Sequence, residues 1–186
     1  MELTEAIRRR RSVRKFTDYA VTDDEITELL EAARWAPSWA NTQAWEFIVV
    51  REKALIEKVA ETYAEKNPAY KCTLAASVLI VVCAKTGISG TVGERDATKF
   101  TNWFMFDVGM AVQNISLRAH ELGLGTVVVG LMDQDACRTV LSVPEQYEVV
   151  VVLPVGQPAV TAKEGPPRKE LKEFVHLNTF GNTFTV

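Results

Sequence analysis

A cluster of basic residues is the part of this chain whose composition most clearly predicts chemistry. Six of the 21 Lys and Arg residues fall within Arg8–Lys15, although the protein carries a net charge of -3. No acidic residue lies between Ala6 and Thr17 to neutralise the cluster. Guanidinium groups donate paired hydrogen bonds to phosphate and carboxylate oxygens. The cluster therefore faces solvent, a polyanion or a bound group with concentrated negative charge, such as a phosphate.

Within the cluster, Arg10, Ser12 and Arg14 are the best candidates for binding an anion. Alternate side chains of an extended segment point the same way, so these residues would bring two guanidinium groups and a hydroxyl to one anion. A run of charges considered alone is more often a solvated helix end. Arg8 and Arg9 keep that plainer interpretation, and Arg11 stays undecided.

Composition limits the class of protein. A length of 186 residues with 47% hydrophobic content predicts one domain over residues 1–186 with a sizeable core. A pI of about 5.5 argues against a general nucleic-acid binder. Cys72, Cys83 and Cys137 lie far apart without a CxxC pair, which predicts reduced core thiols and no metal. No export signal and no run of about 18 apolar residues is visible, so we expect a soluble cytoplasmic protein without a membrane partner.

The first elements must position the basic cluster. The pattern predicts a helix from Leu3 to about Arg10 and then a short extended piece through Phe16, so the cluster straddles a helix end. Thr22–Glu25 is a capping box that begins a second helix. That helix ends before Pro37 and delivers Pro37–Asn41 to a loop.

The rest of the chain alternates between predicted strands and helices, which indicates an α+β fold of the α/β sandwich type. Continuous apolar, β-branched runs predict strands that are buried on both faces. The strands are expected at 45–50, 77–84, 126–129 and 147–154, and the helices between them at 53–64, 101–122 and 134–141.

The helix predicted over 101–122 carries two apolar stripes, which favours a homodimer with this helix at its centre. The chain after Pro154 has little core of its own, so we expect it to lie on the partner subunit. The first stripe is Phe104, Val108, Ala111, Val112, Ile115, Ala119 and Leu122, and the second is Trp103, Phe106, Met110 and Leu117.

Arg10–Phe16 and Ala36–Phe47 form two linked sequence signatures, and both resemble those of the nitroreductase family. Arg10–Phe16 resembles the family's N-terminal FMN-binding signature, and Ala36–Phe47 is similar to its A-P-S-x-x-N-x-Q-P-W-x-F segment. The resemblance runs from Ala6 to about Gly181. Two further stretches match: Glu121–Thr126 with Gly130, and Leu153–Gly156 followed by Pro167–Lys169.

The resemblance implies a nitroreductase-like fold, in which helices flank a central, mostly antiparallel sheet and a C-terminal extension wraps the partner subunit. It also implies a homodimer with FMN at the interface. Arg10 and Arg168 would hold the phosphate, Ser12 would lie near the ribityl chain, and Arg14 near the ring. The backbone N–H of Gly130 would meet flavin N5. The residues implied for cofactor binding are Arg10, Arg11, Ser12, Arg14, Pro37, Ser38, Trp39, Asn41, Val129, Gly130, Arg168 and Lys169.

Some positions carry less specific expectations. Phe100 and Trp103 are candidates for the substrate pocket, with core packing as the plainer alternative. Asn67 and Lys71 are candidates for a further flavin contact. The chain departs from the family pattern at Ala44, where proline is common, and at Val129, where some relatives have glutamate.

The activity that the resemblance implies is that of an NAD(P)H-dependent FMN oxidoreductase. NADH or NADPH would give hydride to flavin N5, and a nitroaromatic, a quinone or a similar planar electrophile would then accept it in a ping-pong cycle. No catalytic side chain is implied. The alternatives are a specialised flavin or enone reductase, a reductive dehalogenase, a non-catalytic flavin-binding redox module and a plain dimeric interaction protein.

Overall fold

The computed structural model describes residues 1–93, 95–160 and 165–184. Its main sheet has the strand order β1 (Trp45–Val50), β2 (Val78–Lys85), β6 (Tyr147–Gly156) and β5 (Gly125–Thr126). A separate hairpin consists of β3 (Thr91–Val92) and β4 (Arg95–Asp96). The helices are α1 (Leu3–Arg9), α2 (Asp23–Arg34), α3 (Lys53–Glu61), α4 (Tyr70–Ala75), α5 (Phe104–Glu121) and α6 (Gln134–Val140), with 3-10 turns η1 (Trp39–Asn41) and η2 (Leu171–Glu173).

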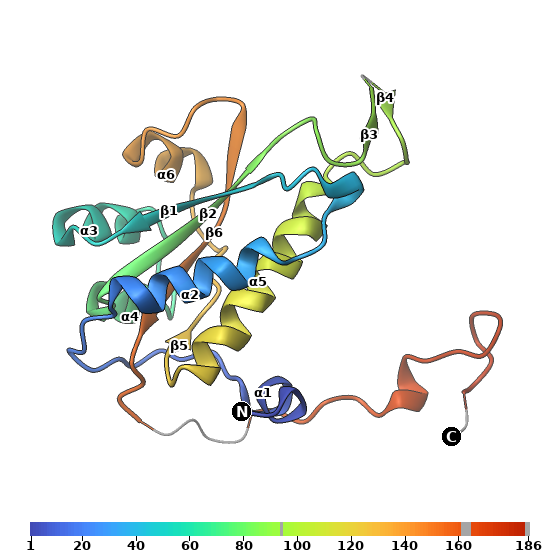
Figure 1. Cartoon of the computed structure of the whole chain (residues 1–186), viewed down its shortest axis with the longest axis horizontal. Helices are drawn as coiled ribbons and strands as arrows, with labels where there is room; N and C mark the ends of the chain where they lie inside the picture. Colours follow the sequence, from blue (N-terminus) through green and yellow to red (C-terminus); the bar gives the residue numbers. More distant parts are fainter. Residues whose placement is uncertain (94, 161–164, 185–186) are drawn as a thin grey trace.

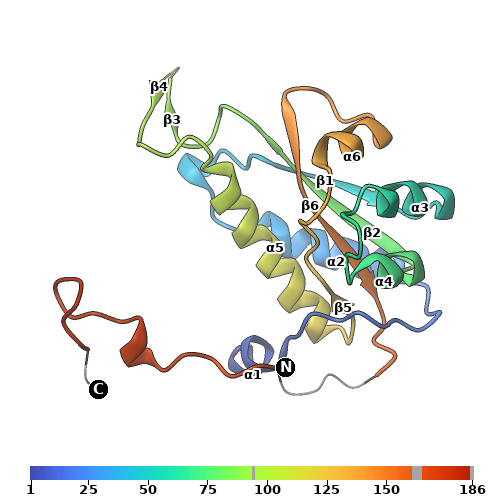
Figure 2. The same ribbon diagram turned by 180° about the vertical axis from the view of Figure 1, so that it is seen from behind.

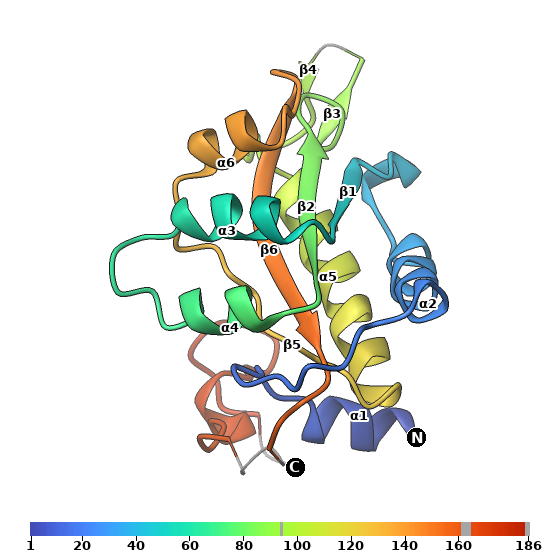
Figure 3. The ribbon, with the colours of Figure 1, turned by 90° about the vertical axis from the view of Figure 1, so that its left-hand side faces the viewer.

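The main sheet is the middle layer of a sandwich. Its neighbouring strands are all antiparallel, which confirms the predicted α+β fold. Alternate side chains of β2 point to opposite faces. Figure 3 shows α2 and α5 on one side of the sheet and α3, α4 and α6 on the other. Ile80 and Val82 pack in the layer of α2 and α5, whereas Leu79 and Val81 pack in the other layer. Burial on both faces explains why β2 is apolar at nearly every position.

The two helices of the first layer begin at sites that the local sequence defines. At the start of α2, Thr22 Oγ1 accepts a hydrogen bond from the Glu25 backbone N–H, and Glu25 Oε2 accepts one from Thr22, so the predicted capping box is confirmed. α5 begins at Phe104 and not at Thr101. The indole of Trp103 donates to Thr98 Oγ1 at 2.6 Å and keeps the preceding residues in a loop.

The strand predicted over 126–129 is wrong in extent, because β5 ends at Thr126. Thr126 pairs with Val155 and Val129 forms a bridge with Val152, so the same register would place Val127 opposite Pro154. Proline has no amide hydrogen to donate to a ladder. The pairing between this segment and β6 is therefore interrupted at Pro154, and only the bridge between Val129 and Val152 follows.

Several elements were not predicted from the sequence, and others end earlier than predicted. α4 and the hairpin of β3 and β4 were not predicted, and α3, α6 and α1 end at Glu61, Val140 and Arg9. The C-terminal segment from residue 165 extends away from the sandwich (Figures 1 and 2). Most of its large apolar side chains, such as Phe180, are exposed. None of the described helices is long and apolar enough to cross a membrane.

Candidate functional site

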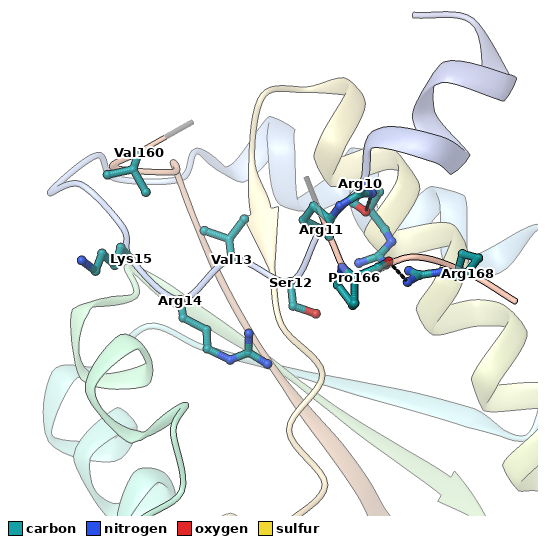
Figure 4. A pocket seen from close by; sticks show the side chains of 10 residues that line it. Arg10, Arg11, Ser12, Val13, Arg14, Lys15, Val160, Pro166 and Arg168 are labelled. Carbon is teal, nitrogen blue, oxygen red and sulfur yellow. Dashed lines mark hydrogen bonds between the residues drawn. The ribbon is translucent and has the colours of Figure 1, made fainter. Parts of the chain in front are cut away.

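The basic cluster begins in the last turn of α1 and continues from Arg10 on an extended segment that is fixed against β5. The backbone N–H of Val13 donates to the carbonyl oxygen of Thr126 at 2.9 Å, and Ser12 forms a parallel bridge with Thr126. A Cβ atom on Gly125 would lie 2.5 Å from Val13 Cγ2, so only glycine admits the Val13 side chain here. Ser12 and Arg14 point away from Val13, as the alternation predicts (Figure 4).

A cavity of about 720 Å³ brings the basic cluster to a residue from the far end of the chain. Arg10, Arg11, Ser12 and Arg14 line this cavity together with Arg168 (Figure 4). No acidic side chain of the described residues lines it. We call it the basic cavity. The remaining lining residues are Val13, Lys15, Val160, Gly165 and Pro166.

The basic cavity concentrates positive charge. Partial burial lowers the pKa of the Arg10 guanidinium, and the nearby charges of Arg11 and Arg168 lower it further. Among the described residues, no ion pair involves Arg10 or Arg168. Arg168 Nη1 instead donates to the carbonyl oxygen of Pro166 at 2.9 Å. Such mutual repulsion favours the binding of an anion.

Arg11 is oriented differently from its neighbours. Its Nη1 donates to the carbonyl oxygen of Arg10 at 2.9 Å, at the end of α1. Its Nε is buried without a hydrogen-bond partner within the described part of the chain. A Cβ atom on Gly165 would lie 2.7 Å from this Nε, so the segment before Arg168 packs directly on Arg11. Arg11 thus shapes the basic cavity while its guanidinium turns to the backbone.

The predicted loop residues form a second group. Ala40, Asn41 and Gln43 have positive φ values of 44°, 56° and 48°, a conformation that costs free energy for residues other than glycine. Ser38 Oγ accepts from the backbone N–H of Gln43 at 3.0 Å and helps to hold this turn. The turn exposes Asn41, whose Oδ1 accepts from the Gln43 side chain at 3.3 Å.

Aromatic side chains surround this loop. The ring centroids of Trp39 and Trp103 lie 5.0 Å apart, and Phe100 and Phe106 meet the Trp103 ring edge to face. Phe100 and Trp103 line a cavity of about 580 Å³. Pro37, Ser38 and Trp39 line an adjoining one of about 300 Å³, which also contacts Trp103 and Phe106. We call these two cavities together the aromatic slot.

One chain does not bring the two groups together. A small cavity beside Arg10 is lined by Ser116 and His120, near the end of α5, whereas the cavity beside Trp39 is lined by Asp107, in its first turn. An 18-residue helix is about 27 Å long. Figure 1 shows α1 at one end of α5 and the hairpin of β3 and β4 at the other.

Val129 and Gly130, which the resemblance implies for cofactor binding, differ in exposure. Val129 is only 3% exposed, so its side chain belongs to the core, and Gly130 is exposed. A Cβ atom on Gly130 would meet only Val151, at an ordinary 3.5 Å. Packing among the described residues therefore does not require a glycine at 130, whereas close approach of a ligand would.

Asn67 and Lys71 differ in their surroundings. Asn67 is buried; its Nδ2 donates to the carbonyl oxygen of Leu131 at 2.8 Å, and its Oδ1 accepts from the Ala69 backbone N–H. Asn67 thus holds the backbone next to Gly130. Lys71 and Lys169 are exposed, and neither lines the basic cavity.

Comparison with known proteins decides the family. The sequence profile described as the nitroreductase family matches residues 7–157, which is most of the chain. The chain belongs to the nitroreductase family. The predicted family and its class of enzyme, the oxidoreductases, are thereby confirmed.

Individual relatives agree with this membership. A Methanothermobacter thermautotrophicus protein assigned as an NADH dehydrogenase/NAD(P)H nitroreductase is 35% identical, over 95% of this chain and 87% of its own length. A Bacillus subtilis FMN reductase (NADPH) is 28% identical, over 95% of this chain and 73% of its own. The structure of an FMN-dependent nitroreductase from Clostridium difficile matches with a TM-score of 0.79 and 26% identity, covering 96% of this chain and all of that one.

The structure of this nitroreductase-family chain adds a polar residue that sequence reasoning missed. Asp107 is buried in α5 and accepts hydrogen bonds from Trp39 and Ser89. A signal was present in the sequence, since Asp107 lies three residues after Phe104 and four before Ala111, on the stripe predicted to be buried.

Proposed function

We propose that this nitroreductase-family chain is an FMN-dependent oxidoreductase that uses NADH or NADPH as electron donor. The observation that carries the proposal is the basic cavity, where Arg10 and Arg168 meet from distant parts of the chain. The names of two relatives, an FMN reductase and an FMN-dependent nitroreductase, support this choice of cofactor. We further propose that residues 1–186 form one domain and that the enzyme is cytoplasmic.

The residues of the basic cavity suit the phosphate of FMN. Burial lowers the pKa of Arg10 and repulsion from Arg11 and Arg168 adds to this effect; a phosphate dianion would relieve that repulsion, and two guanidinium groups can donate paired hydrogen bonds to it. The volume of about 720 Å³ lies within the usual range for cofactor sites. Ser12 would bind near the ribityl chain, and Arg11 and Lys169 would add positive charge around the phosphate.

Other residues of the chain suit the flavin ring. Arg14 extends from the same face of the segment as Ser12, where a cation would stabilise negative charge on a reduced ring (Figure 4). The absence of a side chain at Gly130 leaves its backbone open to close approach, and Val129 fixes that backbone through its bridge to Val152. When bound, FMN supplies hydride chemistry at N5, between NAD(P)H and a nitroaromatic, quinone or similar planar electrophile, in a ping-pong cycle.

A homodimer would complete the site. The basic cavity and the aromatic slot lie near opposite ends of α5 in one chain, so a second copy is needed to place Pro37, Ser38, Trp39 and Asn41 beside the cofactor. α5 also exposes large apolar side chains, among them Met105 at 52% and Phe106 at 61%. In this arrangement the exposed C-terminal segment would lie on the partner subunit, and Phe100 and Trp103 would border the substrate.

Two measurements on the purified protein test the proposal. An absorption band at about 450 nm that disappears on denaturation and gel filtration would identify a bound flavin. NAD(P)H oxidation that depends on added menadione or a nitroaromatic would then identify a catalyst. A flavin without turnover would indicate a redox module, and a colourless protein that takes up no FMN would contradict the proposal.

A further inference from the structure

Asp107 is a buried carboxylate in an apolar setting. It is 1% exposed and lies in the first turn of α5, between residues that pack against α2 and β1. A carboxylate in such a place is costly unless hydrogen bonds compensate for its lost hydration. The donors that Asp107 contacts should therefore be held firmly.

The two oxygens of Asp107 join two segments to α5. Oδ1 accepts from the backbone N–H of Trp39 at 3.0 Å, and Oδ2 accepts from the Ser89 hydroxyl at 2.6 Å. Trp39 belongs to the strained turn after α2. Ser89 lies in the connection between β2 and α5 that contains β3 and β4, which we call the β3–β4 excursion. Asp107 thus fixes the position of both segments relative to one helix.

The indole N–H groups of Trp39 and Trp103 also donate hydrogen bonds to the β3–β4 excursion. Trp39 Nε1 donates to the carbonyl oxygen of Thr91 at 3.3 Å, and Trp103 Nε1 donates to Thr98 Oγ1 at 2.6 Å. The two rings lie 5.0 Å apart; Trp103 borders both cavities of the aromatic slot, and Trp39 borders the smaller one. The position of each indole therefore depends on a hydrogen bond to the β3–β4 excursion as well as on ring packing.

We propose that Asp107 is a positioning residue that sets the enzyme's affinity for planar aromatic acceptors. By holding Trp39 and the excursion at Ser89, it keeps the Trp39–Trp103 pair in the geometry against which a planar ring stacks. The inference rests on the proposed function for the identity of the reaction. It adds that binding of the acceptor depends on a carboxylate whose two oxygens both accept hydrogen bonds from the protein.

The test compares Asp107→Ala with the conservative Asp107→Asn. The alanine removes both acceptors, so KM for menadione and 4-nitrobenzoate should rise about tenfold to a hundredfold, as expected for a displaced binding group. Turnover of the FMN-saturated enzyme with ferricyanide, which needs no stacking, should stay near wild type. Asparagine keeps an oxygen for the Trp39 N–H and should restore KM to within about threefold.

A matched control separates positioning from general destabilisation. Thr73 is a buried residue of α4, on the opposite face of the sheet, whose hydroxyl donates to the Ala69 carbonyl oxygen. Thr73→Val should leave KM for menadione unchanged. If Asp107→Ala does not fold, Ser89→Ala takes its place, and it should raise KM at least about threefold because Oδ2 loses its donor. Wild-type KM in a folded Asp107→Ala, or in Ser89→Ala, would overturn the inference.

A binding measurement keeps this inference distinct from the proposed function. Menadione should quench tryptophan fluorescence of the protein, and Asp107→Ala should weaken that binding about tenfold or more. If the protein bound no flavin and oxidised no NAD(P)H, yet quenching still depended on Asp107, the proposed function would fail and the positioning role would stand. Equal quenching curves for the wild type and the alanine variant would reject the positioning role alone.

Discussion

The backbone of Gly90 rests directly on the indole of Trp103. A Cβ atom on Gly90 would lie 2.3 Å from Trp103 Cδ1, and Gly90 has a positive φ of 85°. The backbone N–H of Ala97 donates to the Gly90 carbonyl oxygen at 2.8 Å. The β3–β4 excursion therefore packs against the aromatic slot through the contact between Gly90 and Trp103.

This contact makes Gly90→Ala a sharp test of the aromatic slot. The added methyl group should displace Trp103, lowering stability by about 3 kcal/mol and raising KM for menadione. Gly87→Ala is the matched control: its φ is also positive, at 74°, but its Cβ would meet nothing within 4 Å, so only the backbone cost of about 1–2 kcal/mol applies. Equal unfolding free energies for the two variants would show that the Gly90 contact is unimportant.

Loss of the guanidinium groups of the basic cavity should weaken FMN binding. Arg10→Ala and Arg168→Ala should each raise the Kd of FMN roughly 10- to 100-fold, because a hydrogen bond to a charged group contributes about 1.5–3 kcal/mol. Fluorescence titration of apoprotein with FMN measures this. Arg9→Ala serves as the control, since Arg9 is exposed and pairs with Glu5. A double variant that binds FMN as tightly as Arg9→Ala would refute the phosphate assignment.

His120 should make stability depend on pH. Burial lowers its pKa, and so does Arg10; Arg11 and Arg9 act in the same direction, whereas Glu5 raises it. The folded state therefore binds a proton less readily than the unfolded state, so stability is lost as pH falls below the ordinary histidine value of about 6.5. The apoprotein's Tm should drop between pH 7.5 and 5.5, and His120→Gln should drop less. A steeper drop in the glutamine variant would contradict this.

The three cysteines should be inert in the native protein. All are buried, and burial raises the pKa of Cys83 to about 12 and that of Cys137 to about 11, with Cys72 raised as well. At pH 8 the reactive thiolate of Cys83 is about one part in ten thousand. A disulfide-exchange reagent should label all three thiols in guanidinium and none in minutes without it. Rapid native labelling would show that these layers open readily.

Features that depend on neighbouring residues in the sequence were predictable. The capping box at Thr22 and the apolar stripe from Phe104 to Ala119 fix α2 and most of α5 locally. The early end of β5 was not predictable in this way, because its cause, Pro154, lies on another strand. The six-residue α4 has no side-chain cap, and the strands of the β3–β4 hairpin have two residues each, which is too little for a periodic pattern.

The candidate site shows the same limit. Alternation along the extended segment predicted that Ser12 and Arg14 share a side, and the structure brings Arg168 to them through a separate part of the chain. The role of Asp107 needs the positions of Trp39 and Ser89, which only the folded chain provides. Contacts with FMN and the pairing of two chains stay predictions.

Mixing two inactive variants tests the central claim, a flavin site built from two chains. One variant carries Arg10→Ala and Arg168→Ala; the other carries Ser38→Gly, Trp39→Gly and Asn41→Gly. If each site takes its basic cavity from one chain and its loop from the other, every mixed dimer has one intact site. Unfolding and refolding the two together should then restore roughly a quarter of wild-type FMN-dependent NAD(P)H oxidation. Activity no higher than that of the separate variants would contradict the shared site.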